Sequence, residues 1–448
     1  METIMRIRSG AAATIAAVLV VAASAPASAR VPNQTPARKL EGAVSRSLSA
    51  PESRGAVAGV LVTRGAATVL DLNGDRALTP ASLTKLATTL AALLRFGPDH
   101  RFTTTVAGAR PRAGAIVGNA FLIGGGDPTF STAAYAATRY EPAPDDPIPV
   151  PIYHASPPTV EALADAIVRA GVRRIGGALI VDESRFDAER KQRGWLDSYQ
   201  KRNSIEVGNL SALTIDEGLG DVDGNTLAAD PAMSAGRALA SALARRGVTI
   251  AGGVRRGVAP GDANPVAEVK SPPLVEIVDY TNKYSVNYPA EMLLKNLGAA
   301  FGGAGTTTAG VRVVHETLAK AGIPLKGFSI TDGSGLSVLN TITPRTIAAT
   351  IRYALEHDSP AAKAMRDSLP VAGGPGTLFK RLRQAPVQGN LRGKTGLIRH
   401  VRGMAGWVTG LDGSTLIYVT LFNGAASAGR MTAPIDVIAI ALARFPYG

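Results

Sequence analysis

A serine and a lysine three positions apart form the first pair in this sequence that could do chemistry together. In Ser82-Leu83-Thr84-Lys85, the serine follows Pro80 and opens a helical stripe of leucines. Residues at i and i+3 share one face of a helix, so the hydroxyl and the amine can meet. A lysine whose pKa is lowered by burial can take the proton of such a hydroxyl. The pair is therefore predicted to be an activated serine nucleophile and its base.

The same spacing occurs a second time, in Ser198-Tyr199-Gln200-Lys201. This copy stands in a polar stretch, residues 191–203, and no apolar helix follows it. Because a helix must hold the hydroxyl and the amine on one face, Ser82 is predicted to be the nucleophile and Ser198 is not.

Two further short motifs follow in order, Ser285-Val286-Asn287 and Lys394-Thr395-Gly396. Taken alone, the first could be a helix cap and the second a strand entry with a solvated lysine. The ordered set of three motifs is typical of penicillin-binding proteins and class A β-lactamases. The combination of the three motifs, and neither triplet alone, indicates nucleophilic catalysis by a serine.

With these motifs the sequence resembles the serine D-alanyl-D-alanine carboxypeptidase/endopeptidase family of the penicillin-binding protein 4 type, peptidase family S13. Two glycine-rich segments, residues 122–129 (LIGGGDPT) and 332–337 (DGSGLS), carry the resemblance beyond the three motifs. Weaker matches are Asp182-Glu183-Ser184-Arg185-Phe186, Gly194-Trp195 and Ser211-Ala212-Leu213-Thr214. Class A β-lactamases share the motif order but have a much shorter interval between the first two motifs.

The resemblance implies a mechanism through an acyl-enzyme. Ser82 would attack the carbonyl of a D-Ala-D-Ala peptide bond, and Lys85 would accept its proton. The pKa of Lys85 would be lowered by desolvation and by Lys394. Ser285 would relay the proton to the leaving amine.

The resemblance also assigns substrate binding to Asn287, Lys394, Thr395 and Gly396. The asparagine would donate to a peptide carbonyl of the substrate, and the Lys-Thr-Gly segment would face its terminal carboxylate. The oxyanion hole would consist of the backbone N–H groups of Ser82 and Leu397. No metal and no organic cofactor is expected.

Two positions depart from the family pattern. The family usually has a hydroxyl residue directly after Lys-Thr-Gly, whereas this chain has Leu397. The middle residue of the second motif is often polar, and here it is Val286. In the family pattern the hydroxyl after Lys-Thr-Gly helps to hold the substrate carboxylate. Arg399, His400 or Arg402 could supply the missing hydrogen bond, but the sequence does not show in which direction their side chains point. We expect activity with an altered carboxypeptidase efficiency.

Composition limits the other classes of function. The 448 residues include no cysteine and five scattered histidines, so neither a disulfide framework nor a metal site is expected. The formal charge of +13 suggests an anionic environment. Aromatic residues make up only 5% and no basic arm is present, so we expect no nucleic-acid partner. Two explanations of the positive charge stay open. One is a weak attraction to anionic wall polymers or a membrane surface, and the other is a merely basic composition.

The first 29 residues have the pattern of a secretory signal peptide. Arg6 and Arg8 precede an apolar run over 11–23, and Ala27-Ser28-Ala29 is a small-x-small cleavage site. An uncleaved membrane anchor is the alternative. We expect an exported protein that is soluble after cleavage and works outside the cytoplasm, in the periplasm or the cell-wall space.

The expected fold is α/β (α+β): a transpeptidase/β-lactamase-like domain built from residues 30–94 and 266–448, with mixed α/β domains inserted over 95–265. Strands are predicted at 57–62, 67–72, 178–181, 248–254, 328–330, 403–409 and 415–422. Helices are predicted from Leu83 to Leu94 and at 160–170, 238–246, 311–321 and 347–355, with a further stripe at 292–297. The Pro-rich segment 140–158 is predicted to be a surface loop.

The sequence predicts an exported D-Ala-D-Ala carboxypeptidase that acts on peptidoglycan stem peptides and is acylated by β-lactams. An additional endopeptidase activity is left open. A β-lactamase is the first alternative, although no Glu-x-x-Leu-Asn-type segment is found where a deacylating water would need it. The second alternative is a catalytically silent peptidoglycan-binding protein, with Leu397 as the mark of decay. The oligomeric state is left open.

Overall fold

The structure is a computed structural model that describes residues 35–140, 153–424 and 427–446. Residues 36–448 form one compact unit. The predicted signal peptide, residues 1–29, lies outside the described residues, and so does most of the predicted loop 140–158. No helix within the described ranges is both long and apolar enough to cross a membrane.

A five-stranded antiparallel sheet joins the two ends of the chain. Its strand order is β13-β14-β15-β1-β2, with β13 at Arg392–Ile398, β14 at Val401–Thr409, β15 at Thr415–Asn423, β1 at Val57–Arg64 and β2 at Ala67–Leu72. Pairing of β1 with β15 runs from Val57 opposite Asn423 to Arg64 opposite Leu416. The predicted strands at 57–62, 67–72, 403–409 and 415–422 are confirmed. Strand β13, which carries the Lys-Thr-Gly motif, was not predicted because its residues, RGKTGLI, have no clear apolar alternation.

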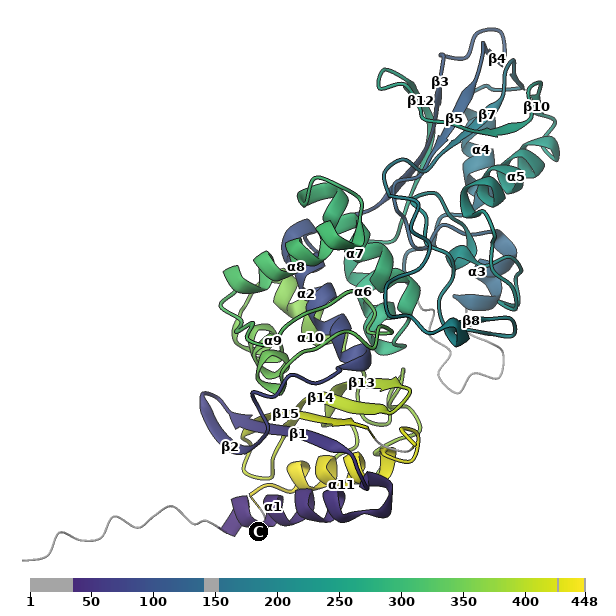
Figure 1. Ribbon diagram of the computed structural model, residues 1–448. Coiled ribbons are helices and arrows are strands. Elements are labelled where there is room, and N and C mark those ends of the chain that lie inside the picture. The colour runs from purple at the N-terminus through teal and green to yellow at the C-terminus, as the bar shows by residue number, and fades with distance from the viewer. Residues whose placement is uncertain (1–34, 141–152, 425–426, 447–448) are drawn as a thin grey trace, which may run out of the picture. The chain divides into compact units, whose positions relative to one another are not determined.

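Two terminal helices cover one face of this sheet, α1 at Thr35–Ser49 and α11 at Thr432–Ala443 (Figure 1). Leu40 of α1 and Ile435 of α11 share a core with Val62 and Phe422 of the strands. The sequence analysis predicted neither helix. Helix α11 is apolar on nearly every side, so it lacks the one-sided stripe that identifies a surface helix.

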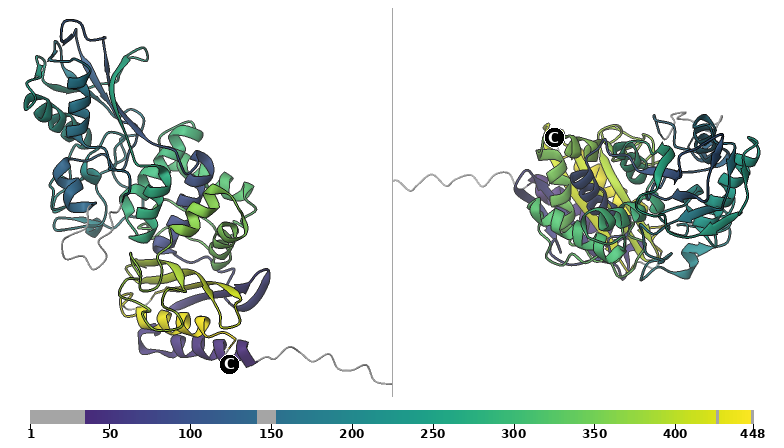
Figure 2. Two further views of the ribbon diagram at one scale, coloured as in Figure 1. Left: turned by 180° about the vertical axis from the view of Figure 1, so that it is seen from behind. Right: turned by 90° about the horizontal axis from the view of Figure 1, so that it is seen from above.

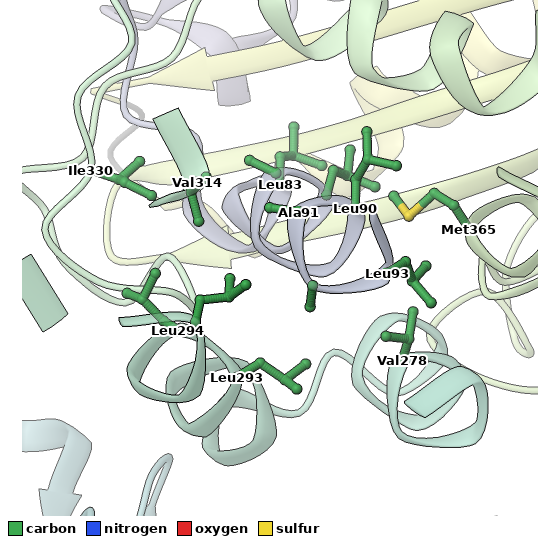
Figure 3. Packing of buried hydrophobic residues seen from close by; sticks show 14 of the residues in the cluster. Leu83, Leu90, Ala91, Leu93, Val278, Leu293, Leu294, Val314, Ile330 and Met365 are labelled. Atoms are coloured by element: carbon green, nitrogen blue, oxygen red, sulfur yellow. The ribbon is translucent and has the colours of Figure 1, made fainter. Parts of the chain in front are cut away.

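A layer of helices covers the other face, with α2 (Thr84–Phe96) at its centre (Figures 1 and 2). Around it lie α6 (Leu274–Lys283), α7 (Asn287–Phe301), α8 (Thr307–Lys320), α9 (Pro344–Glu356) and α10 (Pro360–Asp367). Figure 3 shows Leu83, Leu90 and Leu93 meeting side chains of several of these elements. Every residue from Thr84 to Leu93 is buried. The helix predicted from the leucine stripe is thus confirmed, but it is enclosed on all sides.

The segment between α2 and α6 builds its own sheet. The order is β11-β7-β5-β3-β12, with β11 at Val254–Arg256, β7 at Leu179–Asp182, β5 at Ala120–Ile123, β3 at Thr103–Gly108 and β12 at Asn264–Lys270. Helices α4 (Val160–Arg169) and α5 (Pro231–Ala244) pack on it and share its core. Strand β12 pairs with β3 as far as Lys270, so this sheet extends beyond the predicted boundary at residue 265.

Smaller elements complete this segment. A three-stranded sheet has the order β10-β6-β4, with β10 at Thr249–Ile250, β6 at Arg174–Ile175 and β4 at Ala115–Ile116. Helix α3 spans Ala133–Arg139, and β8 (Gln200–Lys201) forms a short hairpin with β9 (Ser204–Ile205). Part of the segment, including Tyr135, Phe186 and Tyr199, shares the core of α2 and α7.

Most of the remaining predicted elements are confirmed, and the differences have local causes. Helix α5 begins at Pro231 instead of residue 238, because Asp230 caps it by accepting the N–H of Met233. The single strand predicted over 248–254 is wrong, since this stretch contributes to two sheets as β10 and the start of β11. The strand predicted at 328–330 is also wrong, because Ser329 makes only an isolated bridge to Thr341.

Candidate active site

The Ser-x-x-Lys pair lies where the large sheet meets the helical layer. Ser82 is in a short 3-10 helix, Ala81–Leu83, that leads directly into α2. Lys85, in the first turn of α2, donates from Nζ to Ser82 Oγ over 3.0 Å. Ala81 adopts φ 50°, in the left-handed region that a residue with a side chain rarely occupies. The turn thus holds the hydroxyl over the amine in the way that the i, i+3 spacing predicted.

Lys85 is completely buried and has two further acceptors. Its Nζ lies 2.7 Å from Asn287 Oδ1 and 2.7 Å from the carbonyl oxygen of Ser334. Burial lowers the pKa of Lys85 to about 7, against the opposing effect of nearby carboxylates, foremost that of Asp332. At neutral pH a large share of this amine is therefore unprotonated and can act as a base.

The second lysine of the site, Lys394 on β13, is also fully buried. It donates to Ser285 Oγ over 2.7 Å and to the carbonyl of Thr395 over 2.8 Å. The alternative of a solvated lysine at a strand entry is therefore excluded. Burial, followed by the charges of Lys85 and Arg402, holds the pKa of Lys394 well below its usual value. The repulsion between the two buried amines is reciprocal, so it disfavours a state in which both are protonated.

The Ser-x-Asn motif connects α6 to α7. Ser285 lies in the connection with φ 62°, and Asn287 is the first residue of α7. The Asn287 side chain accepts from Lys85 through Oδ1 and donates through Nδ2 to the carbonyl oxygen of Glu206, 2.9 Å away. An amide nitrogen carries two hydrogens, so one can still be donated to a substrate carbonyl.

The residues after Lys394 run along the nucleophile turn. A Cβ at Gly396 would lie 3.0 Å from the carbonyl oxygen of Pro80, so a side chain there would require this turn to move by a few tenths of an ångström. Thr395 donates from Oγ1 to Thr377 Oγ1 over 3.0 Å. Leu397 is 50% exposed, in contrast to its buried neighbours on the strand.

These elements enclose a cleft of about 860 Å³. Its lining joins the nucleophile, the other two motifs and the inserted segment: Ser82, Ser285, Asn287, Thr395, Leu397, Arg402, Tyr199 and Glu206. Lys85 and Lys394 lie beneath this surface, since both are fully buried. Within the described ranges, no cluster of three or more His, Asp or Glu side chains is placed to hold a metal ion. The cleft can therefore present a nucleophile, two buried amines and backbone donors to one ligand.

The second Ser-x-x-Lys copy has a different environment. Ser198 lies in a 3-10 helix, Asp197–Tyr199, and Lys201 in strand β8, and both residues are exposed. The two side chains do not share a helix face, so the copy lacks the geometry of the first.

The sequence analysis missed the group that supports Lys85 from behind. Glu291 of α7 is buried and accepts the backbone N–H groups of Gly333, at 3.1 Å, and Ser334, at 2.8 Å. Burial, followed by the charge of Asp332, raises the pKa of Glu291 to about 8. A glutamate inside the apolar run AEMLL of a buried helix is the sequence signal that could have identified it.

Asp332 organises the same loop. It accepts from the backbone of Gly335 and Ser337 and from the indole Nε1 of Trp195, at 2.9, 2.6 and 2.9 Å. Gly335 adopts φ 88°, and a Cβ there would lie 1.9 Å from the carbonyl oxygen of Ala81. The loop 332–337 therefore presses directly on the nucleophile turn.

Known carboxypeptidases are similar to this chain over most of its length. The family model described as D-Ala-D-Ala carboxypeptidase 3 (S13) matches residues 40–226 and 222–442. A D-alanyl-D-alanine carboxypeptidase of Actinomadura sp. (strain R39) is 30% identical over 89% of this chain and 83% of its own length. The carboxypeptidase DacB of Mycolicibacterium smegmatis is 30% identical over 91% of this chain and 85% of its own.

Among solved structures, penicillin binding protein 4 (dacB) of Haemophilus influenzae has the same fold, with a TM-score of 0.76 at 20% identity over 90% of this chain and 99% of that one. A complex of that protein with a β-lactam matches with a TM-score of 0.68, at 21% identity over 89% of this chain and 98% of that one. The mixed α/β fold class is thereby confirmed. The chain belongs to the D-Ala-D-Ala carboxypeptidase 3 (S13) family and is an enzyme of the serine D-alanyl-D-alanine carboxypeptidase class.

Proposed function

We propose that this protein is exported and removes the terminal D-alanine from peptidoglycan stem peptides through an acyl-enzyme at Ser82, and that β-lactams acylate the same serine. One observation carries the proposal. Ser82, Ser285 and Asn287 open onto one cleft, and the buried Lys85 amine lies 3.0 Å from the Ser82 hydroxyl oxygen. The similarity to a D-alanyl-D-alanine carboxypeptidase, and to a penicillin binding protein whose structure contains a β-lactam, supports it.

Acylation would begin with the attack of Ser82 Oγ on the carbonyl carbon between the two D-alanines. Lys85 accepts the hydroxyl proton, since its lowered pKa leaves much of the amine neutral near pH 7. The developing oxyanion is bound by the backbone N–H groups of Ser82 and Leu397.

Expulsion of D-alanine requires a proton on its nitrogen. Lys394 donates to Ser285 Oγ, so the Ser285 hydroxyl hydrogen is available for the leaving nitrogen. Lys85 then returns a proton to Ser285, and water releases the acyl group from Ser82. The terminal carboxylate of the substrate would lie beside Thr395 and Leu397, which both line the cleft.

Export is proposed from the pattern of residues 1–29, and a weak attraction to anionic wall polymers from the formal charge of +13. Binding to isolated cell walls should weaken as salt is raised, because exposed charges more than about 10 Å apart are screened at 0.1 M ionic strength. Wall binding that is indifferent to salt would contradict the electrostatic part of the proposal.

The test is intact-mass spectrometry of the purified protein with benzylpenicillin, followed by peptide mapping. We expect a persistent single adduct on Ser82 that Ser82→Ala abolishes. Ser198→Ala is the matched control, because it removes the serine of the other Ser-x-x-Lys copy and should leave the adduct unchanged. D-alanine release from a D-Ala-D-Ala peptide by the unmodified enzyme completes the test.

The alternatives give different results in the same experiment. A transient adduct with accumulating hydrolysed drug would indicate a β-lactamase. Absence of both adduct and hydrolysis, with binding of an uncleaved stem peptide, would indicate a silent binding protein.

A further inference from the structure

Leu397 stands where the family pattern has a hydroxyl residue, and a basic residue lies opposite it across the hairpin. Strand β13 pairs with β14 so that Leu397 lies directly opposite Arg402. Directly opposite residues of an antiparallel pair point to the same face. Thr395, Leu397 and Arg402 all line the cleft, so the arginine reaches the part of it where the Lys-Thr-Gly segment ends.

The guanidinium of Arg402 has an unused hydrogen-bond donor. Its Nε is buried and has no hydrogen-bond partner among the residues that the structure describes. A buried donor without an acceptor is costly, and a guanidinium offers five N–H groups in a fixed fork that suits a carboxylate. An anionic ligand with two oxygens would supply the acceptor that the Arg402 Nε lacks.

The acidic side chain whose charge acts on Arg402 does not supply that anion. Asp436 of α11 is bound by Arg381, whose guanidinium donates to Oδ1 over 2.5 Å and to Oδ2 over 3.4 Å. Burial and then the charge of Arg381 lower the Arg402 pKa to about 10, against the opposing effect of the Asp436 charge. At neutral pH the guanidinium is still protonated.

The other basic groups at this end of the cleft are differently placed. Lys394 is committed to Ser285 and to the Thr395 carbonyl. Arg399 lies at the exposed hairpin turn and donates from Nε to His400 Nε2 over 3.1 Å. All three basic residues after Leu397 line the cleft, and Arg402 is the one of them that is partly buried.

We propose that Arg402 binds the terminal carboxylate of the substrate beside Thr395, and so takes over the contact that a hydroxyl at position 397 makes in the family pattern. The inference rests on the proposed function, because it concerns a peptide with a free C-terminal D-alanine. It assigns carboxylate selectivity to a residue outside the three motifs.

The test pairs each variant with two peptides, an N-acylated tripeptide ending in D-Ala-D-Ala and the same tripeptide with a C-terminal carboxamide. Arg402→Gln should lower kcat/KM for the free acid about 30-fold, the size of one lost hydrogen-bonded ion contact, and change it less than about threefold for the amide. Arg402→Lys should recover part of the loss, since it restores the charge but not the fork.

Arg392→Gln is the matched control, because Arg392 stands at the far end of the neighbouring strand β13 and does not line the cleft. It should leave the ratio of acid to amide turnover unchanged. Equal losses on acid and amide in Arg402→Gln would assign a structural role to the guanidinium and overturn the proposal. An acid-specific loss in Arg399→Gln, with none in Arg402→Gln, would also overturn it.

Equilibrium binding of the same two peptides to Ser82→Ala, with and without Arg402→Gln, separates this inference from the proposed function. If the unmodified enzyme hydrolyses neither peptide, the proposed function fails, yet preferential binding of the acid that depends on Arg402 would still support the carboxylate site. Equal binding of acid and amide would refute the site even if hydrolysis is observed.

Discussion

Lys85 and Glu291 hold the same residue from two sides. The carbonyl oxygen of Ser334 accepts from Lys85 Nζ over 2.7 Å, and the N–H of Ser334 donates to Glu291 over 2.8 Å. The two side chains come from different helices, α2 and α7, and meet only through this loop residue. The position of the catalytic base therefore depends on a carboxyl group that lies behind it.

The pH dependence of acylation should report the Lys85 pKa. The neutral amine is the form that accepts the Ser82 proton, and burial lowers its pKa from 10.5 to about 7. The rate of acylation by benzylpenicillin should therefore rise as pH increases through about 7 and level off above it. Stopped-flow or quenched-mass measurements from pH 5 to 10 would check this. A rate that still climbs steeply near pH 10 would show an unperturbed lysine.

Glu291→Gln and Glu291→Ala should separate the effect of the Glu291 charge on the Lys85 pKa from the hydrogen bonds by which Glu291 holds the loop. The glutamine can keep an oxygen toward Gly333 and Ser334, but it cannot acquire the negative charge that Glu291 takes on as pH rises through about 8 and that raises the Lys85 pKa. The upper part of the acylation profile, near pH 8, should then be reached at lower pH in Glu291→Gln, with the fold intact. The alanine leaves two buried N–H groups unsatisfied and should cost about 3 kcal/mol of unfolding free energy. Identical pH profiles for wild type and Glu291→Gln would contradict the electrostatic role.

Gly335→Ala tests the contact between the 332–337 loop and the nucleophile turn. The new Cβ would lie 1.9 Å from the Ala81 carbonyl oxygen, so the turn carrying Ser82 must shift. We expect acylation to fall at least about 100-fold, because small displacements at a nucleophile have effects of this size.

Gly322→Ala is the control for backbone strain. Gly322 has a similar φ of 73°, but its Cβ would meet nothing within 4 Å. This variant should lose only about 1–2 kcal/mol of stability and retain activity. Similar losses of acylation in both variants would mean that the contact with Ala81 is unimportant.

Leu397→Thr restores the hydroxyl of the family pattern. One additional hydrogen bond to the substrate carboxylate, worth about 1 kcal/mol, should raise kcat/KM for the D-Ala-D-Ala acid about fivefold. The gain should be larger in an Arg402→Gln background, where the carboxylate has lost its other partner. Steady-state kinetics of the single and double variants measure this coupling, and equal kcat/KM for Leu397→Thr and wild type would contradict it.

Local patterns were sufficient to predict several parts of the molecule. The leucine stripe predicted α2, and the i, i+3 spacing predicted that Lys85 could reach Ser82, because both depend only on the period of one helix. The hairpin of β1 and β2 and the C-terminal strands followed from apolar runs separated by turn residues. The ordered motifs predicted the family that the comparisons identify.

The tertiary structure alone decided which groups meet and which charges are desolvated. Lys394 and Ser285 are joined only because β13 lies at the edge of the large sheet beside the α6–α7 connection. The burial that lowers the pKa of both lysines and the support from Glu291 come from elements far apart in the chain. Periodicity describes which face of an element is apolar, but it contains no information on which other element covers that face.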